Sequence, residues 1–201
     1  MKTLHRGDLF CWSQFDQDRN IDFNSYCWVR DGGNVVIDPL PLSEHDRAHL
    51  EQLGGASWIV ITNSDHTRDA VALAKQLGAK LAGPAAEKDT LGVTCDRWLA
   101  DGDELVPGAA VLALDGSKTP GELAIVLEGT TLITGDLVRV HRANTLMILP
   151  DPKLKDKALA IASLTRLAAL EGVEAVLVGD GYPVFEGGHL KLAALAASFA
   201  G

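Results

Sequence analysis

The sequence predicts an α/β fold, in which either one mixed β-sheet or two sheets are covered by helices on the outside. Three observations support this class. Short runs of β-branched and apolar residues each stop at a polar residue, helical segments fall in the intervals between several of them, and two pairs of runs are separated by turn signals. Because continuous apolar runs suit strands that are buried on both faces, helices are expected outside the sheets.

Four of the apolar runs are strong strand candidates because each ends directly before a polar residue or a Gly-Asp pair. They are 35–37, 58–62, 131–134 and 175–178. Two hairpins join further strands to this set. The turn at 31–34 separates 26–29 from 35–37, and the turn at 128–130 separates 123–127 from 131–133.

Four helices are predicted between and after these strands. Ser43 is a candidate N-cap for a helix that stops at Gly54, and Gly78 is a candidate C′ residue for a helix over 68–77. Asp151 followed by Pro152 predicts the start of a long helix through 168. The last helix is expected over 189–199.

The chain has 201 residues, 47% of them hydrophobic and 22% charged, so we expect a single folded domain over 1–201. Its net charge is −9 and its basic residues form no run, so nucleic acid is not an expected partner. The start lacks the apolar region of a secretory signal and no 18 apolar residues run together, which predicts a cytoplasmic protein without a membrane partner. The sequence leaves open whether the chain forms a homo-oligomer.

Acidic and amide side chains follow the predicted strands, and the ends of strands are where ligands bind in open sheets. These residues are Asp38, Asn63, Asp65, Asp136 and Asp180. If the strand ends converge, the carboxylates share a small volume and need a compensating cation. Either a metal ion or basic side chains would supply it.

Five segments together resemble the metallo-β-lactamase fold superfamily, in the order that the family has them. Asp38 follows a strand, 60–68 resembles the strand and HxHxDH loop, and 116–122 resembles the GHTPGS loop with one insertion. The segment 132–136 resembles the strand and the Asp that bridges two metals, and 178–181 resembles the last strand with its final His. The resemblance implies a four-layer αββα sandwich of two mixed sheets flanked by helices.

Most metal-ligand positions of that family are substituted in this sequence. When the loop is aligned on Thr62, the family's His, His, Asp and His positions hold Asn63, Asp65, Thr67 and Arg68. Lys118 takes the place of the His in the third motif, Asp180 replaces the last His, and only Asp136 matches. Lys and Arg cannot ligate a metal while charged, so this alignment predicts no cofactor.

In that alignment, Lys118 and Arg68 would face Asp65, Asp136 and Asp180 and form a salt-bridge network in place of the metals. The implied function is a catalytically diverged or non-catalytic protein that binds a small anionic molecule. The candidate catalytic set is Asp65, His66, Arg68, Lys118, Asp136 and Asp180. Candidate ligand-binding residues are Asn63, Arg139 and His141, and His66 is expected at the surface or behind the site.

A second alignment, shifted by two residues, remains as the alternative. It places Asp65 and His66 on the family's Asp-His pair and, with Asp136 and Asp180, gives four ligands for one divalent ion. This oxygen-rich set suits Mn²⁺, Fe²⁺ or Mg²⁺ better than Zn²⁺. Such a site implies a metal-dependent hydrolase of ester-like or thioester-like substrates.

Overall fold

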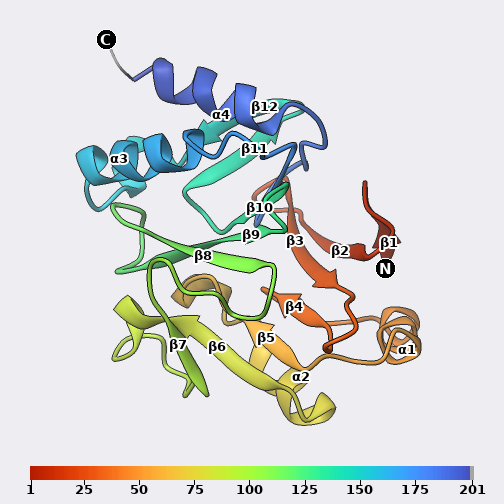
Figure 1. The fold of residues 1–201 in the computed structure, drawn as a ribbon. Coiled ribbons are helices and arrows are strands. Elements are labelled where there is room, and N and C mark those ends of the chain that lie inside the picture. The colour runs from red at the N-terminus through yellow and green to blue at the C-terminus, as the bar shows by residue number, and fades with distance from the viewer. Residues whose placement is uncertain (200–201) are drawn as a thin grey trace.

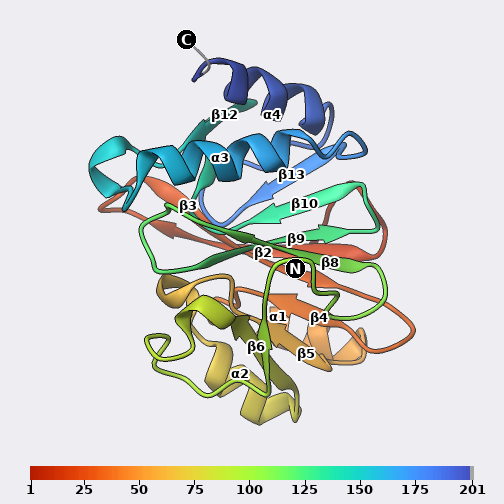
Figure 2. The ribbon, with the colours of Figure 1, turned by 60° about the vertical axis from the view of Figure 1, so that its left-hand side comes forward.

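The chain folds into two β-sheets packed face to face, with a pair of helices on the outer side of each (Figure 1). The computed structural model describes residues 1–199. Figure 2 shows α3 and α4 above the second sheet and α2 at the bottom of the view beside β5 and β6. α1 shares an apolar cluster with α2. The expected αββα sandwich is therefore confirmed.

The first sheet has seven strands, paired in the order in which they occur along the chain. They are β1 (Lys2–Thr3), β2 (Leu9–Asp16), β3 (Ile21–Trp28), β4 (Val35–Ile37), β5 (Trp58–Val60), β6 (Lys80–Pro84) and β7 (Arg97–Leu99). Pairs from β1 to β4 are antiparallel, and pairs from β4 to β7 are parallel. The change follows from the connections, because short turns join β2 to β3 and β3 to β4, whereas helices cross over from β4 to β5 and from β5 to β6.

The second sheet has four strands in the order β13, β10, β9, β8. Their bounds are β8 (Ala109–Leu114), β9 (Glu122–Leu127), β10 (Thr131–Thr134) and β13 (Ala175–Val178), and a separate pair is formed by β11 (Val138–Arg142) and β12 (Thr145–Ile148). β9 and β10 form the predicted hairpin, whose turn places Glu128 and Gly129 at positive φ as a tight hairpin turn requires. β13 pairs with β10 in parallel, so their carboxyl ends lie at one edge.

The four helices are α1 (Glu44–Gln52), α2 (Ala70–Leu77), α3 (Lys157–Ala168) and α4 (Gly188–Ala197). Ser43 accepts a hydrogen bond from the Asp46 N–H, and Gly78 ends α2 with a φ of 66°, as predicted. The predicted start of α3 at Asp151 is wrong. Asp151–Lys153 is a separate 3₁₀ turn, and the helix begins after Asp156, whose side chain accepts from the Leu159 N–H.

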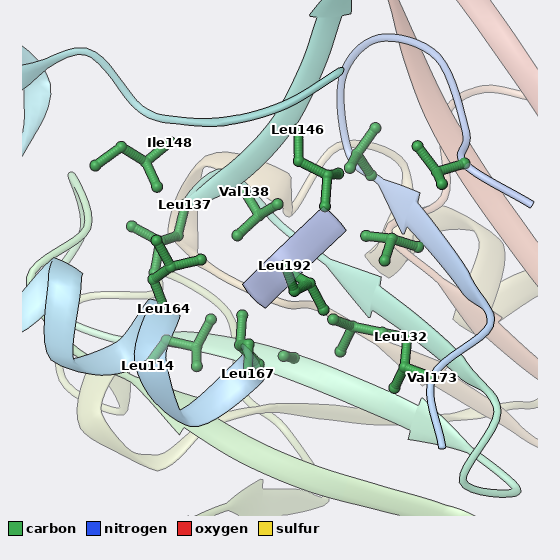
Figure 3. Close-up of a cluster of buried hydrophobic side chains, with 14 of the residues drawn as sticks. Leu114, Leu132, Leu137, Val138, Leu146, Ile148, Leu164, Leu167, Val173 and Leu192 are labelled. Atoms are coloured by element: carbon green, nitrogen blue, oxygen red, sulfur yellow. The ribbon is translucent and has the colours of Figure 1, made fainter. Parts of the chain in front are cut away.

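Three apolar clusters hold the layers together. One lies between the sheets and joins side chains such as Val60 of β5 to Ile125 of β9. A second lies between the first sheet and α1 and α2, and the third packs Leu164 and Leu192 of α3 and α4 against the second sheet and β11 and β12 (Figure 3). Strands such as β4 and β13 are buried along their whole length because they contact apolar layers on both sides.

The ends of the predicted strands converge because hydrogen bonds tie the two sheets together beside them. The Leu123 N–H donates to the Thr62 carbonyl at 2.8 Å, and the Asn24 N–H donates to the Gly179 carbonyl at 2.9 Å.

No helix within residues 1–199 is long and apolar enough to cross a membrane.

Candidate functional site

A cavity of about 700 Å³ opens where the strand ends converge. Most of its lining residues are charged or titratable, namely Asp16, Arg19, Asp65, His66, Arg68, Lys118, Asp136, Arg139, His141, Lys153 and Asp180. The loops after β5, β8, β10 and β13 supply many of them, with β11 adding Arg139 and His141. The cavity therefore brings together eight of the nine site residues predicted from sequence, and the ninth, Asn63, is buried directly behind it.

Lys118 lies between two carboxylates of the cavity. Its Nζ is 2.7 Å from Asp65 Oδ2 and 3.1 Å from Asp136 Oδ2. Burial would lower the pKa of Lys118, but the charges of Asp136 and Asp65 outweigh it and raise the pKa. Asn63 Nδ2 donates to the same Asp136 oxygen at 3.0 Å. Lys118 is thus a cation held between Asp65 and Asp136, as the first alignment predicts.

His66 is buried and joins two carboxylates, so of its two expected places, at the surface or behind the site, the surface is excluded. Its Nδ1 is 2.7 Å from Asp38 Oδ2, and its Nε2 is 3.6 Å from Asp136 Oδ2. Burial would lower the pKa of His66, but the charge of Asp38 and the hydrogen bonds to Asp136 and Asp38 raise it to about 9. His66 is therefore a second internal cation at neutral pH.

The pKa of Asp136 shifts in the opposite direction from that of His66. Burial would raise its pKa, but the hydrogen bond and charge of His66, followed by those of Lys118, hold the pKa well below the usual range. This carboxylate is therefore ionised at neutral pH. It is the common partner of Lys118, His66 and Asn63.

Asp180 is paired with Arg139, and this corrects the prediction that Lys118 and Arg68 neutralise it. The Arg139 guanidinium donates to both carboxylate oxygens, with Nε 3.3 Å from Oδ1. His141 Nε2 lies 3.1 Å from Asp180 Oδ2. Burial together with the charges of Arg139 and Lys153 lowers the pKa of His141. Arg139 and His141 therefore belong to the internal network as well as to the cavity wall.

Arg68 forms no ion pair within the part of the chain that the structure describes, which corrects its predicted place in the carboxylate network. Its guanidinium donates to the main-chain carbonyls of Asn24 at 2.7 Å, Asp38 at 3.0 Å and Gly179 at 3.4 Å. Its Cζ also lies 5.6 Å from the centroid of the Phe23 ring. Carbonyl dipoles orient this guanidinium without cancelling its charge, so the charge remains available to the cavity.

Two buried glutamates that were not predicted as site residues connect the loops of the site. Glu87 accepts from the Ser64 N–H at 2.8 Å and from the Gly121 N–H at 3.0 Å. Glu122 accepts from the N–H groups of residues 136 and 137 and from the Ser117 hydroxyl. Burial and the charge of Asp136 raise the pKa of Glu122 to about 7. Glu122 is the last residue of the segment that resembles the GHTPGS loop, so its charge at that position could have identified it as a site residue. Nothing in the sequence around Glu87 indicates a role in the site.

The donor set does not fit the metal centre of the second alignment. Among residues 1–199, no group of three or more His, Cys, Asp or Glu side chains is arranged to hold a metal ion. Lys118 lies between Asp65 and Asp136, the His66 Nδ1 faces Asp38, and Arg139 holds Asp180. The four proposed ligands Asp65, His66, Asp136 and Asp180 are thus each engaged by another protein group.

Comparison with known proteins shows the family of this chain. The family model of the metallo-beta-lactamase superfamily matches residues 1–199. The chain therefore belongs to the metallo-β-lactamase superfamily.

A curated relative and two solved structures show how this chain compares within that family. It is 30% identical over 166 residues to hydroxyacylglutathione hydrolase from Acidiphilium cryptum (strain JF-5), a match that covers 79% of this chain and 65% of that longer protein. It matches the FIM-1 metallo-beta-lactamase of Pseudomonas aeruginosa in its mono-zinc form with a TM-score of 0.70 at 14% identity, over 94% of this chain and 90% of that one. A metallo-beta-lactamase family protein from Thermus thermophilus matches with a TM-score of 0.70 at 18% identity, over 96% of this chain and 79% of that one. At these identities the two structures establish the fold alone.

Proposed function

We propose that this chain binds a small anionic molecule in the cavity at the strand ends, where basic side chains take the place that metal ions have in the family. The observation that carries the proposal is the charge of the cavity wall. Five Lys and Arg side chains line it against four Asp, although the whole chain carries a net charge of −9. A cavity with excess positive charge in an acidic protein favours an anion.

The basic side chains of the wall divide into two groups. Lys118 and Arg139 are held by buried carboxylates and so give the cavity its shape. Nearby carboxylates balance the charge of the other three, Arg68, Arg19 and Lys153, less completely. Arg68 is bound by carbonyls, Arg19 lies 3.8 Å from Asp16, and Lys153 has no ion pair within residues 1–199. These three are the groups that would contact a phosphate or carboxylate of the ligand.

Calorimetric titration with inorganic phosphate and with succinate tests the proposal. We expect saturable binding that weakens about fivefold to tenfold in Lys153→Gln, which corresponds to roughly 1 kcal/mol for one charge contact. Lys155→Gln is the matched control, because Lys155 is also exposed but does not line the cavity. Equal affinities in the two variants, or no binding of either anion, would overturn the proposal.

A second candidate function is hydrolysis of an ester or thioester, favoured by the 30% identity to a hydroxyacylglutathione hydrolase. Its test is the metal content of protein purified without chelator, together with the rate of thioester hydrolysis before and after chelator treatment. One bound ion per chain and a chelator-sensitive rate would support the hydrolase and contradict the metal-free arrangement. Asp136→Asn would then abolish the rate, because Asp136 is the carboxylate that matches the family's bridging Asp.

A further inference from the structure

The four carboxylates that line the cavity differ in how much of their surface is accessible. Asp136 and Asp180 have only 4% and 2% of their side-chain surface accessible, and each is held by basic partners. The side chain of Asp65 is 53% accessible, and that of Asp16 is 31% accessible. Of these four acids, Asp65 is therefore the one most open to a molecule in the cavity.

Asp65 and Lys118 present a hydrogen-bond acceptor and a donor side by side. Asp65 Oδ2 is 2.7 Å from Lys118 Nζ, whereas Asp65 Oδ1 accepts no hydrogen bond from residues 1–199. Lys118 has three N–H donors and two carboxylate partners, Asp65 and Asp136, so one donor remains. Because both side chains line the cavity, a ligand can reach the free acceptor and the free donor together.

The chemistry of this pair selects the group that binds to it. An ionised carboxylate only accepts hydrogen bonds, so the ligand group beside Asp65 must be a donor, either a hydroxyl or an ammonium. The charges of Lys118, next to Asp65, and of Arg68 in the same cavity would repel an ammonium. A hydroxyl adds no charge, and it can donate to Asp65 while it accepts from Lys118. The pair therefore favours a hydroxyl.

An apolar group would find little surface in this cavity. Among its 14 lining residues, the apolar ones are Ile21, Phe23 and Leu40. The guanidinium groups of Arg19 and Arg68 lie over the Phe23 ring, each with its Cζ 5.6 Å from the ring centroid, and Leu40 is buried. A cavity of about 700 Å³ also has room for a ligand much larger than phosphate. The rest of the ligand is thus expected to be polar.

We infer that the ligand is a hydroxylated anion, in which a phosphate or carboxylate faces Arg68 and Lys153 and a hydroxyl bridges Asp65 and Lys118. This inference rests on the proposed function, because the cavity must bind the anionic group. Sugar and polyol phosphates, and the corresponding hydroxy acids, are the chemical class that carries both groups.

Pairs of ligands with equal numbers of carbon atoms test the inference by calorimetry. The phosphate pairs are glycerol 3-phosphate with propyl phosphate and glucose 6-phosphate with hexyl phosphate, and the carboxylate pairs are glycerate with propanoate and gluconate with hexanoate. The arm that binds more tightly identifies the anionic group. In that arm we expect the hydroxylated member to bind about fivefold to tenfold more tightly than its alkyl partner. The phosphates with a terminal ammonium, 3-aminopropyl and 6-aminohexyl phosphate, should bind no more tightly than the alkyl phosphates.

Asp65→Ala removes the proposed hydroxyl acceptor, so the gain from hydroxyl groups should fall below about twofold. The affinity for propyl phosphate should not decrease, because the cavity loses a negative charge. Asp89→Ala is the matched control, since Asp89 is also exposed but does not line the cavity, and it should keep the full gain. The ligand pairs are also compared on the wild type, so the test does not depend on the folding of Asp65→Ala.

The outcomes separate this inference from the proposed function. If the alkyl anions bind in a Lys153-dependent manner but hydroxyl groups give no gain, the hydroxylated ligand is wrong and the proposed function stands. If no anion of either arm binds, both are wrong. Tighter binding of an aminoalkyl phosphate than of its hydroxylated counterpart, or an equal hydroxyl gain in the Asp65 and Asp89 variants, would also overturn the inference.

Discussion

The Lys118 Nζ and the Asp136 Oδ2 lie 3.1 Å apart at the centre of the cavity wall. The same Asp136 oxygen accepts from Asn63 Nδ2 at 3.0 Å and lies 3.6 Å from His66 Nε2. One buried carboxylate oxygen is thus surrounded by an ammonium, an amide and an imidazolium. The stability of this arrangement depends on each of the two cations, and the two can be tested separately.

Lys118→Met should lower the free energy of unfolding by about 1–3 kcal/mol, because it leaves a buried Asp136 without its ammonium partner. The lower part of this range reflects the partial exposure of Lys118, whose side chain is 27% accessible. Urea denaturation measures the change, with Lys155→Met as the control at an exposed lysine. An unchanged unfolding midpoint in Lys118→Met would rule out the network as a source of stability.

The free energy of unfolding should fall in mild alkali, because His66 loses its proton there. Its pKa is about 9 in the folded chain against the ordinary value of 6.5, so its contribution is fully present below pH 6.5 and is lost as the pH rises through 9. The full difference amounts to about 3 kcal/mol. Urea denaturation at intervals from pH 7 to pH 9.5 should show this loss in the wild type and in His45→Gln, whose histidine is exposed on α1. In His66→Gln most of this slope should be absent, and a slope parallel to that of the wild type would contradict the assignment.

Glu87→Ala should lower the free energy of unfolding by about 2–4 kcal/mol, because the N–H groups of Ser64 and Gly121 lose their buried acceptor. Glu51→Ala, at an exposed position on α1, should change stability by less than about 0.5 kcal/mol. Glu87→Ala should also weaken phosphate binding, since the two loops that it joins carry Asp65 and Lys118. Wild-type phosphate affinity in a destabilised Glu87→Ala protein would show that Glu87 stabilises the fold without positioning the site.

Substitutions at Arg139 and Asp180 should have coupled effects on the free energy of unfolding. Arg139→Met alone leaves a buried carboxylate with only His141 beside it, and we expect a loss of about 3 kcal/mol. The double variant Arg139→Met/Asp180→Asn removes both charges and should be more stable than the sum of the two single losses predicts, by at least about 1 kcal/mol. A double-mutant cycle by urea denaturation measures this difference. Additive losses would mean that the pair does not act as a unit.

Much of the fold could be predicted because the signals were local. The runs 131–134 and 175–178 coincide with β10 and β13, and Ser43 and Gly78 bound their helices as their side-chain and backbone preferences dictate. β2 was missed because polar residues such as Ser13 and Gln14 interrupt its apolar pattern. The start of α3 was misplaced because both Asp151 and Asp156 can cap a helix, and only packing decides which of them does so.

The residues of the site could largely be predicted from the sequence, but the ion pairs between them could not. Strand ends located Asp136 and Asp180, and the resemblance located Lys118, because these positions follow directly from the order of the elements. Which cation reaches which carboxylate depends on backbone direction. Arg68 has a φ of +37°, and its guanidinium reaches main-chain carbonyls, while Arg139 on β11 reaches Asp180 from a different element. The sequence carries no local signal for either outcome.

Thr134 of β10 and Val178 of β13 are register partners, and Asp136 and Asp180 each follow two residues later. The spacing between the two buried acids is therefore set by the main chain of paired strands, and side-chain motion contributes little to it. A one-residue insertion before either acid would displace it relative to its basic partner. Natural length variation at this edge is thus expected in the turn between β11 and β12 or beyond Tyr182, and not within the two short connections that carry the acids.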